Sequence, residues 1–321
     1  MRIASYSPAD GGPLRGAICV DGHVVDAAHA ARAAGLLDEA AGTAGAAVWR
    51  SAKALVALSA DDRSRLSEGA AICHARDESE SLESIELGPP IPDPEKIICI
   101  GLNYRLHADE VAKQVSDFPD VFTKFRGSLI GHGGTIEVPD LTSCVDWEGE
   151  LAVVIGSEAR NVAVEDAMDH IAGCMAFNDV SARDLQMQTS QWTAGKAIDT
   201  FAPCGPWLVT LDDIGDPGDL VIRTRVNGNV MQESHTGLMI HSIAKTVSFL
   251  SQLMLLKPGD IIATGTPEGV GMSRTPPQYL APGDVVEVEL ERVGSLVNTV
   301  GRAGGAGADR PVAGTAEVTA G

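Results

Sequence analysis

The stretch Asp146-Trp147-Glu148-Gly149-Glu150-Leu151-Ala152-Val153-Val154-Ile155-Gly156 decides the fold. Its apolar half is nearly continuous and is followed by a glycine, which is typical of a β-strand buried on both faces. Because side chains alternate between the two faces of a strand, Glu148 and Glu150 lie on the same face where this strand begins. Two adjacent carboxylates repel, so the pair either ends the strand in solvent or holds a cation. A hard divalent cation such as Mg²⁺ or Mn²⁺ prefers such oxygen ligands.

A third carboxylate, Asp179, follows a second small apolar segment. It stands in Asn178-Asp179-Val180-Ser181-Ala182-Arg183-Asp184, just after the segment Ile171 to Ala176. Taken alone, Asp179 is typical of an Asx turn or a helix N-cap. Asp184 either pairs with Arg183 or faces solvent.

His107 and Glu110 are three residues apart, so they are neighbours if their segment is helical. Such a pair is either a base with its orienting carboxylate or an exposed helical pair. Residues 108–117 can form a short helix but offer few large apolar side chains to anchor it. We therefore expect residues 105–119 to form a marginally stable lid that orders when substrate binds.

A proline-rich stretch, Leu87-Gly88-Pro89-Pro90-Ile91-Pro92-Asp93-Pro94, predicts an extended linker. It separates a small amino-terminal domain, residues 1–90, from a larger domain, residues 95–300. In the first domain, Asp21-Gly22 predicts a hairpin turn, and alanine-rich sequence from Ala27 to Ala57 predicts helices.

The larger domain contains short apolar runs punctuated by glycine and proline, which are strand signals. Only 164–170 and 241–256 have a convincing helical pattern. The expected fold class is therefore α+β and β-rich, with a smaller amino-terminal α/β domain. Residues 302–321 are rich in glycine and alanine and predict a flexible tail.

The composition excludes several classes of function. The 24 Lys and Arg against 44 Asp and Glu give a formal net charge of −20, which disfavours nucleic-acid and anionic-membrane binding. The first residues lack an apolar core of signal-peptide length, and no run of about 18 uncharged apolar residues occurs, so we expect a cytoplasmic protein. The 6 cysteines are dispersed singly, which predicts neither disulfides nor a thiolate zinc site.

Several of these segments, in this order, resemble the fumarylacetoacetate hydrolase superfamily over residues 96–300. The resemblance rests on Ile100-Gly101-Leu102-Asn103-Tyr104 with His107 and Glu110, Phe122-Thr123-Lys124, Asp146 to Leu151, Asn178 to Asp184, Gln191-Trp192 with Gly195-Lys196, Pro258-Gly259-Asp260, and Thr264-Gly265-Thr266-Pro267. The resemblance implies a mixed β-roll or sandwich core and a homodimer. Gly149 departs from the family pattern, where a larger apolar residue is usual, so we expect it to loosen the strand.

The resemblance also implies roles for the site residues. The Mg²⁺ or Mn²⁺ ligands of the family match Glu148, Glu150 and Asp179. The catalytic dyad of the family, which lies on a mobile lid, matches His107 and Glu110. Lys196 is expected to stabilise developing negative charge and, with Arg183, Gln186 and Thr266, matches positions that line the substrate pocket.

Members of this family act on 2-oxo acids or 1,3-dicarbonyl compounds. The function expected by resemblance is metal-dependent hydrolysis of a C–C bond in an acylpyruvate, as in aromatic catabolism. Decarboxylation of an oxaloacetate-type acid and isomerisation of a 2-hydroxy-dienoate pass through the same enolate and stay open. A non-catalytic metal-binding module is the rival from another class.

Overall fold

The computed structural model describes residues 1–8, 12–38, 40 and 42–304. Its strands are β1 (Arg2–Ser7), β2 (Arg15–Val20), β3 (His23–Asp26), β4 (Glu80–Ser81), β5 (Glu86–Gly88), β6 (Ile97–Gly101), β7 (Asp120–Lys124), β8 (Leu129–Ile130), β9 (Thr135–Val138), β10 (Val145–Asp146), β11 (Gly149–Ile155), β12 (Ile171–Asn178), β13 (Ser181–Ala182), β14 (Ala202–Thr210), β15 (Val221–Val226), β16 (Asn229–His235), β17 (Ile261–Ala263), β18 (Val285–Leu290) and β19 (Gly294–Arg302). The α-helices are α1 (Ala27–Ala33), α2 (Gly42–Trp49), α3 (Ala52–Val56), α4 (Ala60–Ala75), α5 (Arg105–Glu110), α6 (Arg183–Gln186), α7 (Thr193–Lys196), α8 (Leu211–Ile214) and α9 (Ile243–Leu253).

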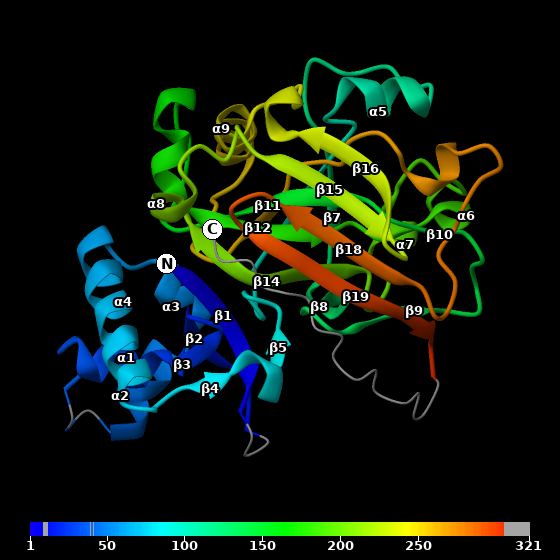
Figure 1. Cartoon of the computed structure of the whole chain (residues 1–321). Helices are drawn as coiled ribbons and strands as arrows, with labels where there is room; N and C mark the ends of the chain where they lie inside the picture. Colours follow the sequence, from blue (N-terminus) through cyan, green and yellow to red (C-terminus); the bar gives the residue numbers. More distant parts are fainter. Residues whose placement is uncertain (9–11, 39, 41, 305–321) are drawn as a thin grey trace.

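Two sheets pack against each other and form the core (Figure 1). The large mixed sheet has the order β4-β3-β2-β1-β14-β12-β11-β17-β6-β7, with β5 beside β1 and β8 beside β14. The second sheet has the order β16-β15-β18-β19-β9. The fold is α+β and β-rich, as expected.

Strand β11 is buried along its whole length, which explains its nearly continuous apolar sequence. Leu151 and Val153 face the core between the two sheets, where they meet Val288 of the second sheet. Ala152 and Val154 face the opposite core, which the amino-terminal helices cover. The same alternation places Glu148 and Glu150 on the side away from the second sheet.

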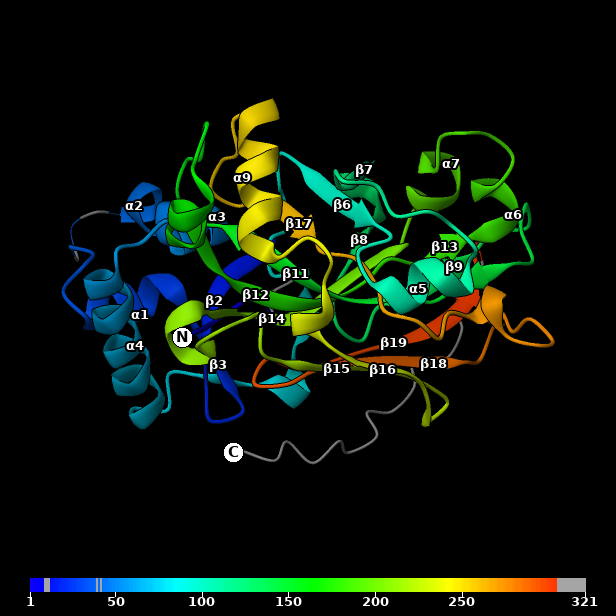
Figure 2. The ribbon, with the colours of Figure 1, turned by 90° about the horizontal axis from the view of Figure 1, so that it is seen from above.

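The amino-terminal strands extend the large sheet instead of forming a separate one. Strand β1 pairs antiparallel with β14, with Ile3 opposite Leu208. The predicted hairpin is confirmed, because Asp21 and Gly22 both have positive φ between β2 and β3. Helices α1, α2 and α4 lie at one end of the molecule, and α5, α6 and α7 at the other (Figure 2).

Helix α4 was not predicted because its sequence is mostly polar and its few apolar positions are small. Ser59 caps its amino terminus by accepting a hydrogen bond from the Asp62 amide, and the helix buries Leu66, Ala70 and Cys73 against the α1 side of the core. Small residues allow α1 and α4 to approach closely: a Cβ added at Gly69 would lie 2.1 Å from the Ala30 carbonyl oxygen.

In the second half, the predicted helix over 241–256 is confirmed as α9. Residues 164–170 form a 3-10 helix instead of an α-helix. The sequence also missed α6, α7 and α8, which have 4 residues each and are too short for a helical periodicity to show. The lid helix α5 spans 105–110, so the prediction of a helix over 108–117 is wrong in extent.

The expected absence of disulfides agrees with the structure, in which all six cysteines are free thiols. In the described part of the chain, no helix is long and apolar enough to cross a bilayer. Arg302, the first residue of the predicted tail, is the last residue of β19 and pairs with Val138. Residues 305–321 of that tail lie outside the described residues.

Candidate active site

The three predicted metal-binding carboxylates meet where two antiparallel strands begin and end. Strand β11 starts at Gly149 opposite Asn178, the last residue of β12, so Glu148 and Glu150 come next to Asp179. One carboxylate oxygen from each of the three lies within 4.8 Å of the others. The exposed fractions of these residues are 5%, 1% and 0%. The burial excludes a solvated strand end, and the Asp179 carboxylate accepts from Lys124 and Lys196 instead of capping a turn or a helix.

Buried cations neutralise part of this acidic cluster. Lys196 Nζ donates to Glu148 Oε2 and to Asp179 Oδ2, both at 2.7 Å. Lys124 Nζ donates to Asp179 Oδ1, and Arg183 Nη1 lies 2.6 Å from Glu148 Oε1. Burial by itself raises the pKa of Glu148, but Lys196 and Arg183 lower it more, so the pKa lies below its ordinary value.

Glu150 has no such cation. Among the described residues, Glu150 Oε2 accepts a hydrogen bond from the Gly265 amide at 2.8 Å, and no lysine, arginine or histidine forms an ion pair with Glu150. Burial, followed by the charges of Asp179 and Glu148, raises its pKa well above the ordinary 4.5. A buried carboxylate without a counter-charge is costly, and a divalent cation held by these oxygens would remove that cost. The chain's own residues therefore fit a hard divalent metal.

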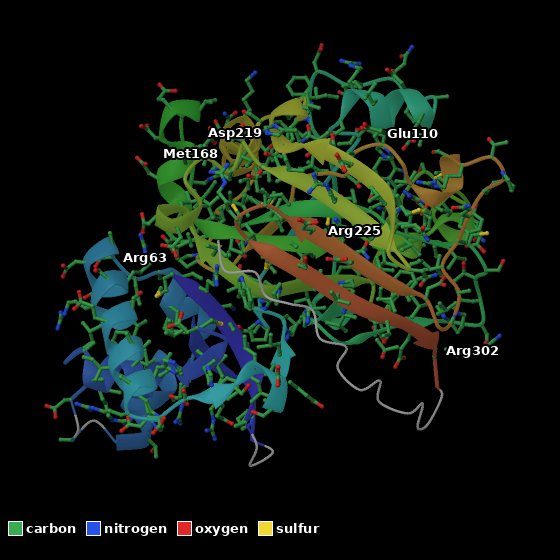
Figure 3. All side chains as sticks on the ribbon, viewed as in Figure 1. Arg63, Glu110, Met168, Asp219, Arg225 and Arg302 are labelled. Atoms are coloured by element: carbon green, nitrogen blue, oxygen red, sulfur yellow. The ribbon has the colours of Figure 1, made fainter. Side chains whose placement is uncertain are left out.

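The predicted dyad forms on α5, in the segment expected to be a lid, and it faces the three carboxylates, which form the floor of the site. His107 Nδ1 lies 2.8 Å from Glu110 Oε1. A carboxylate only accepts, so Nδ1 carries the proton and Nε2 of a neutral ring is a free acceptor. Glu110, labelled on α5 in Figure 3, also accepts from the Gly269 amide at 3.1 Å. This contact ties the lid helix to the loop after β17.

Below the lid, Asn103 anchors the start of α5. Its Nδ2 donates to the Thr264 carbonyl at 2.7 Å, and its Oδ1 accepts from the His241 amide at 2.7 Å. The base of the lid is thus fixed to β17 and to the segment before α9. In contrast, residues 111–119 contain no helix or strand.

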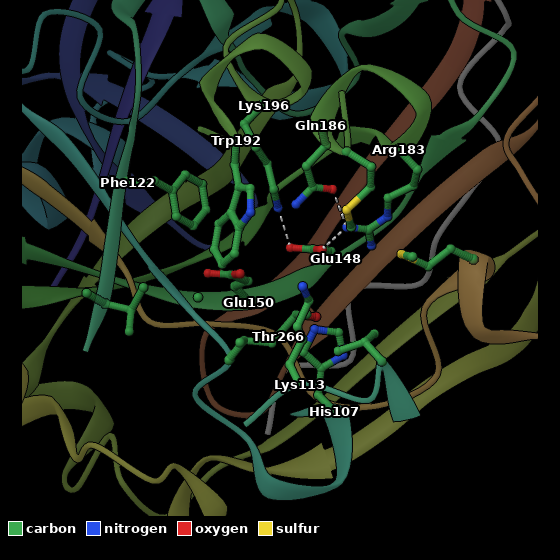
Figure 4. Close-up of a pocket in the computed structure, with 16 residues that line it drawn as sticks. His107, Lys113, Phe122, Glu148, Glu150, Arg183, Gln186, Trp192, Lys196 and Thr266 are labelled. Atoms are coloured by element: carbon green, nitrogen blue, oxygen red, sulfur yellow. Dashed lines mark hydrogen bonds and ion pairs between the residues drawn. The ribbon is translucent and has the colours of Figure 1, made fainter. Parts of the chain in front are cut away.

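Seven of the nine predicted site residues line one pocket of about 70 Å³, and Glu110 and Asp179 lie behind that lining, bound to His107 and Lys196. Figure 4 shows Glu148 and Glu150 between Lys196 on one side and His107 on the other. Other predicted residues in the lining are Arg183, Gln186 and Thr266. Arg183 Nη1 donates to Gln186 Oε1 at 3.0 Å, while its Nη2 is buried with no hydrogen-bond partner. A buried N–H without a partner is a donor available to an anionic ligand.

Comparison with known proteins identifies the family. Residues 96–301 match the model of the fumarylacetoacetate hydrolase carboxy-terminal domain. The chain belongs to the fumarylacetoacetate hydrolase family. It is an enzyme of that family, and the rival interpretation as a non-catalytic binding module falls away.

Curated relatives within the family are named for isomerisation. An oxaloacetate tautomerase of Xenopus laevis, named as mitochondrial, is 47% identical over 222 residues, which cover 68% of this chain and 70% of that protein. The oxaloacetate tautomerase YisK of Bacillus subtilis is 45% identical over 225 residues, 69% of this chain and 75% of that protein.

Solved structures of the family cover nearly the whole chain. A fumarylacetoacetate hydrolase of Exiguobacterium antarcticum is 33% identical with a TM-score of 0.76, covering 94% of this chain and 99% of that one. The maleylpyruvate hydrolase of Sphingobium sp. SYK-6, solved with manganese(II) and pyruvate, is 28% identical with a TM-score of 0.71 and the same coverage.

Sequence reasoning missed the residues that hold the family site in shape. Asp146 accepts from Arg183 Nε at 2.8 Å and from the Gly271 amide at 2.7 Å, so it orients the guanidinium. Gln232 of β16 accepts from the Gly149 amide at 2.9 Å and donates to Thr266 Oγ1 at 2.8 Å. No local signal distinguishes Gln232, because it is 83 residues from its partner in β11.

The expectation that Gly149 loosens the metal-binding strand is wrong. Gly149 is buried and faces the second sheet, where an added Cβ would lie 2.0 Å from Thr224 Oγ1 and 3.3 Å from Val288 Cγ1. The absence of a side chain lets the second sheet pack directly behind Glu148 and Glu150.

Proposed function

We propose that this enzyme is an oxaloacetate tautomerase that interconverts the keto and enol forms, with Mg²⁺ or Mn²⁺ held by Glu148, Glu150 and Asp179. The observation that carries the proposal is that His107, paired with Glu110, lines the same pocket as Glu148 and Glu150. The names of the tautomerases at 45–47% identity support it. The manganese(II) and pyruvate in the maleylpyruvate hydrolase support the metal and the 2-oxo acid class.

The chain's residues can move the proton without a second reactant. When bound, the divalent cation supplies a Lewis acid that draws electron density from a 2-oxo acid. His107 Nε2 takes a proton from C3, and Glu110 stabilises the imidazolium through Nδ1. The C–H electron pair forms the C2–C3 double bond, and His107 returns the same proton to the C2 oxygen. Neither water nor another reactant is consumed.

Arg183 and Lys196 act on the negative charge of the substrate in this proposal. The free Nη2 of Arg183 binds the substrate carboxylate, while Asp146 fixes the guanidinium plane. Lys196 is held by two carboxylates at the floor of the pocket and adds positive potential near the developing enolate.

Hydrolysis of an acylpyruvate, the main expectation from sequence, is the second candidate. The maleylpyruvate hydrolase among the similar structures favours it. Hydrolysis needs an additional nucleophilic water in the pocket, whereas tautomerisation needs only the dyad. The tautomerases are more similar in sequence, so they favour the isomerase alternative.

One experiment separates these reactions. The purified enzyme is given Mg²⁺ or Mn²⁺, and the ultraviolet absorbance of oxaloacetate enol is followed while pyruvate formation is measured separately. We expect rapid equilibration of the enol with no matching release of pyruvate. Pyruvate formed as fast as the oxaloacetate enol disappears would establish a decarboxylase instead. In a parallel assay with acetylpyruvate as substrate, hydrolysis faster than the equilibration of oxaloacetate would establish the hydrolase. The His107→Ala variant controls for catalysis by free metal.

A further inference from the structure

Lys113 is a pocket residue that no sequence motif identifies. It follows the lid helix and contributes to the lining of the pocket with His107, Glu148 and Arg183. Figure 4 shows its side chain entering from the lid side, with Lys196 on the opposite side of the two glutamates in this view. The sequence gives no reason to single out this lysine, because it lies in a polar segment without periodicity.

The backbone at the end of α5 directs Lys113 into the pocket. The Lys113 amide donates to the Ala108 carbonyl at 2.9 Å, and the Ala112 amide donates to the Asp109 carbonyl at 3.1 Å. These two bonds form a Schellman motif, in which the chain reverses at a left-handed residue. Here that residue is Ala112, with φ at +53°. A left-handed alanine is less favourable than glycine, so the turn is held by its surroundings.

Lys113 is also the pocket cation whose charge is not neutralised. Lys196 and Arg183 are bound to carboxylates of the floor, and His107 is bound to Glu110. Within the described part of the chain, the Lys113 ammonium has no ion pair or side-chain hydrogen bond. When the first carboxylate of a ligand is bound at the floor of the site, the rest of the ligand therefore faces one further positive charge, the Lys113 ammonium.

The geometry points to Lys113 as the residue that selects dicarboxylic 2-oxo acids, by binding the carboxylate at the far end of the substrate. This inference rests on the proposed function, since that function places the 2-oxo acid end at the floor. A monocarboxylic acid fills the floor and leaves Lys113 without a partner. A charge-assisted hydrogen bond in a partly buried pocket makes a difference of about ten- to a hundredfold in affinity.

The test compares two stable acids that differ only in the far carboxylate, L-malate and L-lactate. Their affinities for the Mn²⁺-loaded enzyme are measured by titration calorimetry. We expect wild type to bind malate more tightly. Lys113→Met should weaken malate binding about ten- to a hundredfold and change lactate binding by less than about twofold. Lys113→Arg keeps the charge and should retain most of the preference.

Lys245→Met is the matched control, because Lys245 is exposed on α9 and lies outside the pocket lining. It removes the same charge and should leave both affinities unchanged. The role of Lys113 would be overturned if Lys113→Met weakened the binding of malate and lactate equally, or if the wild-type enzyme bound the two acids with the same affinity. Neither result would affect the proposed function. A wild-type enzyme that binds neither acid and does not equilibrate oxaloacetate would overturn the proposed function as well.

Discussion

Replacing Glu150 by glutamine should make the metal-free protein more stable. Burial and two neighbouring carboxylates raise the pKa of Glu150 well above 4.5, so the folded protein binds its proton more tightly than the unfolded chain does. Stability due to this group is therefore fully present below about pH 4.5 and is lost as the pH rises toward the raised value. The loss is about 1.4 kcal/mol per pH unit over that interval. Glutamine avoids this cost and still accepts the Gly265 amide.

A bound metal should reverse the sign of this effect. At a metal concentration a hundred times the dissociation constant, binding stabilises the folded wild type by about 2.7 kcal/mol. Glu150→Gln loses one of the three proposed ligands and should gain little. The variant is thus expected to be the more stable protein in chelator at pH 8, and the less stable one in excess Mn²⁺.

Urea unfolding at pH 5 and pH 8, with chelator or with Mn²⁺, measures both effects. Glu158→Gln is the control, because it makes the same chemical change at an exposed glutamate. A variant less stable than wild type in chelator at pH 8 would refute the argument from the buried charge. If Mn²⁺ raised the free energy of unfolding of wild type and Glu150→Gln by the same amount, Glu150 would not be a metal ligand.

Four further outcomes are expected. His107→Ala should lower turnover by about two to four decades with nearly unchanged Mn²⁺ affinity, measured by kinetics and calorimetry; unchanged turnover would reject the dyad. Gly149→Ala should cost about 1–3 kcal/mol in urea unfolding, partly restored by adding Thr224→Ala, because the added Cβ meets Thr224 Oγ1. His132 is half-buried, and its Nδ1 accepts a hydrogen bond from the Val297 amide. Burial lowers the pKa of His132 below 6.5, so the folded state favours the neutral ring. The stability that this ring contributes is fully present above pH 6.5 and is lost as the pH falls through the lowered pKa. In His132→Gln, the free energy of unfolding should fall less between pH 7 and pH 5 than it does in wild type. The same pH dependence in both proteins would contradict this expectation. Light scattering should give twice the 33.4 kDa chain mass, and a monomer mass at micromolar concentration would contradict the dimer.

The local sequence was sufficient for elements whose pattern is dictated by burial. Strand β11 is apolar on both faces because it lies between two cores, and its paired glutamates follow from the period of two. The hairpin at Asp21-Gly22 was predictable because that turn requires positive φ. The helices α6, α7 and α8 were not, because their 4 residues each show no helical period.

The sequence by itself also determined which chemistry is available: three carboxylates, a histidine with a glutamate, and a lysine and an arginine in a chain that is otherwise acidic. Only the tertiary structure decided which of these groups are paired. Lys196 and Arg183 form ion pairs with Glu148, while Glu150 has no ion pair in the described part of the chain and its pKa is raised. That difference depends on the packing of α6 and α7 above the strand ends, which no local pattern specifies. Ion pairs depend on distance in space, and Lys196 and Glu148 are 48 positions apart in a sequence that contains no signal of their contact.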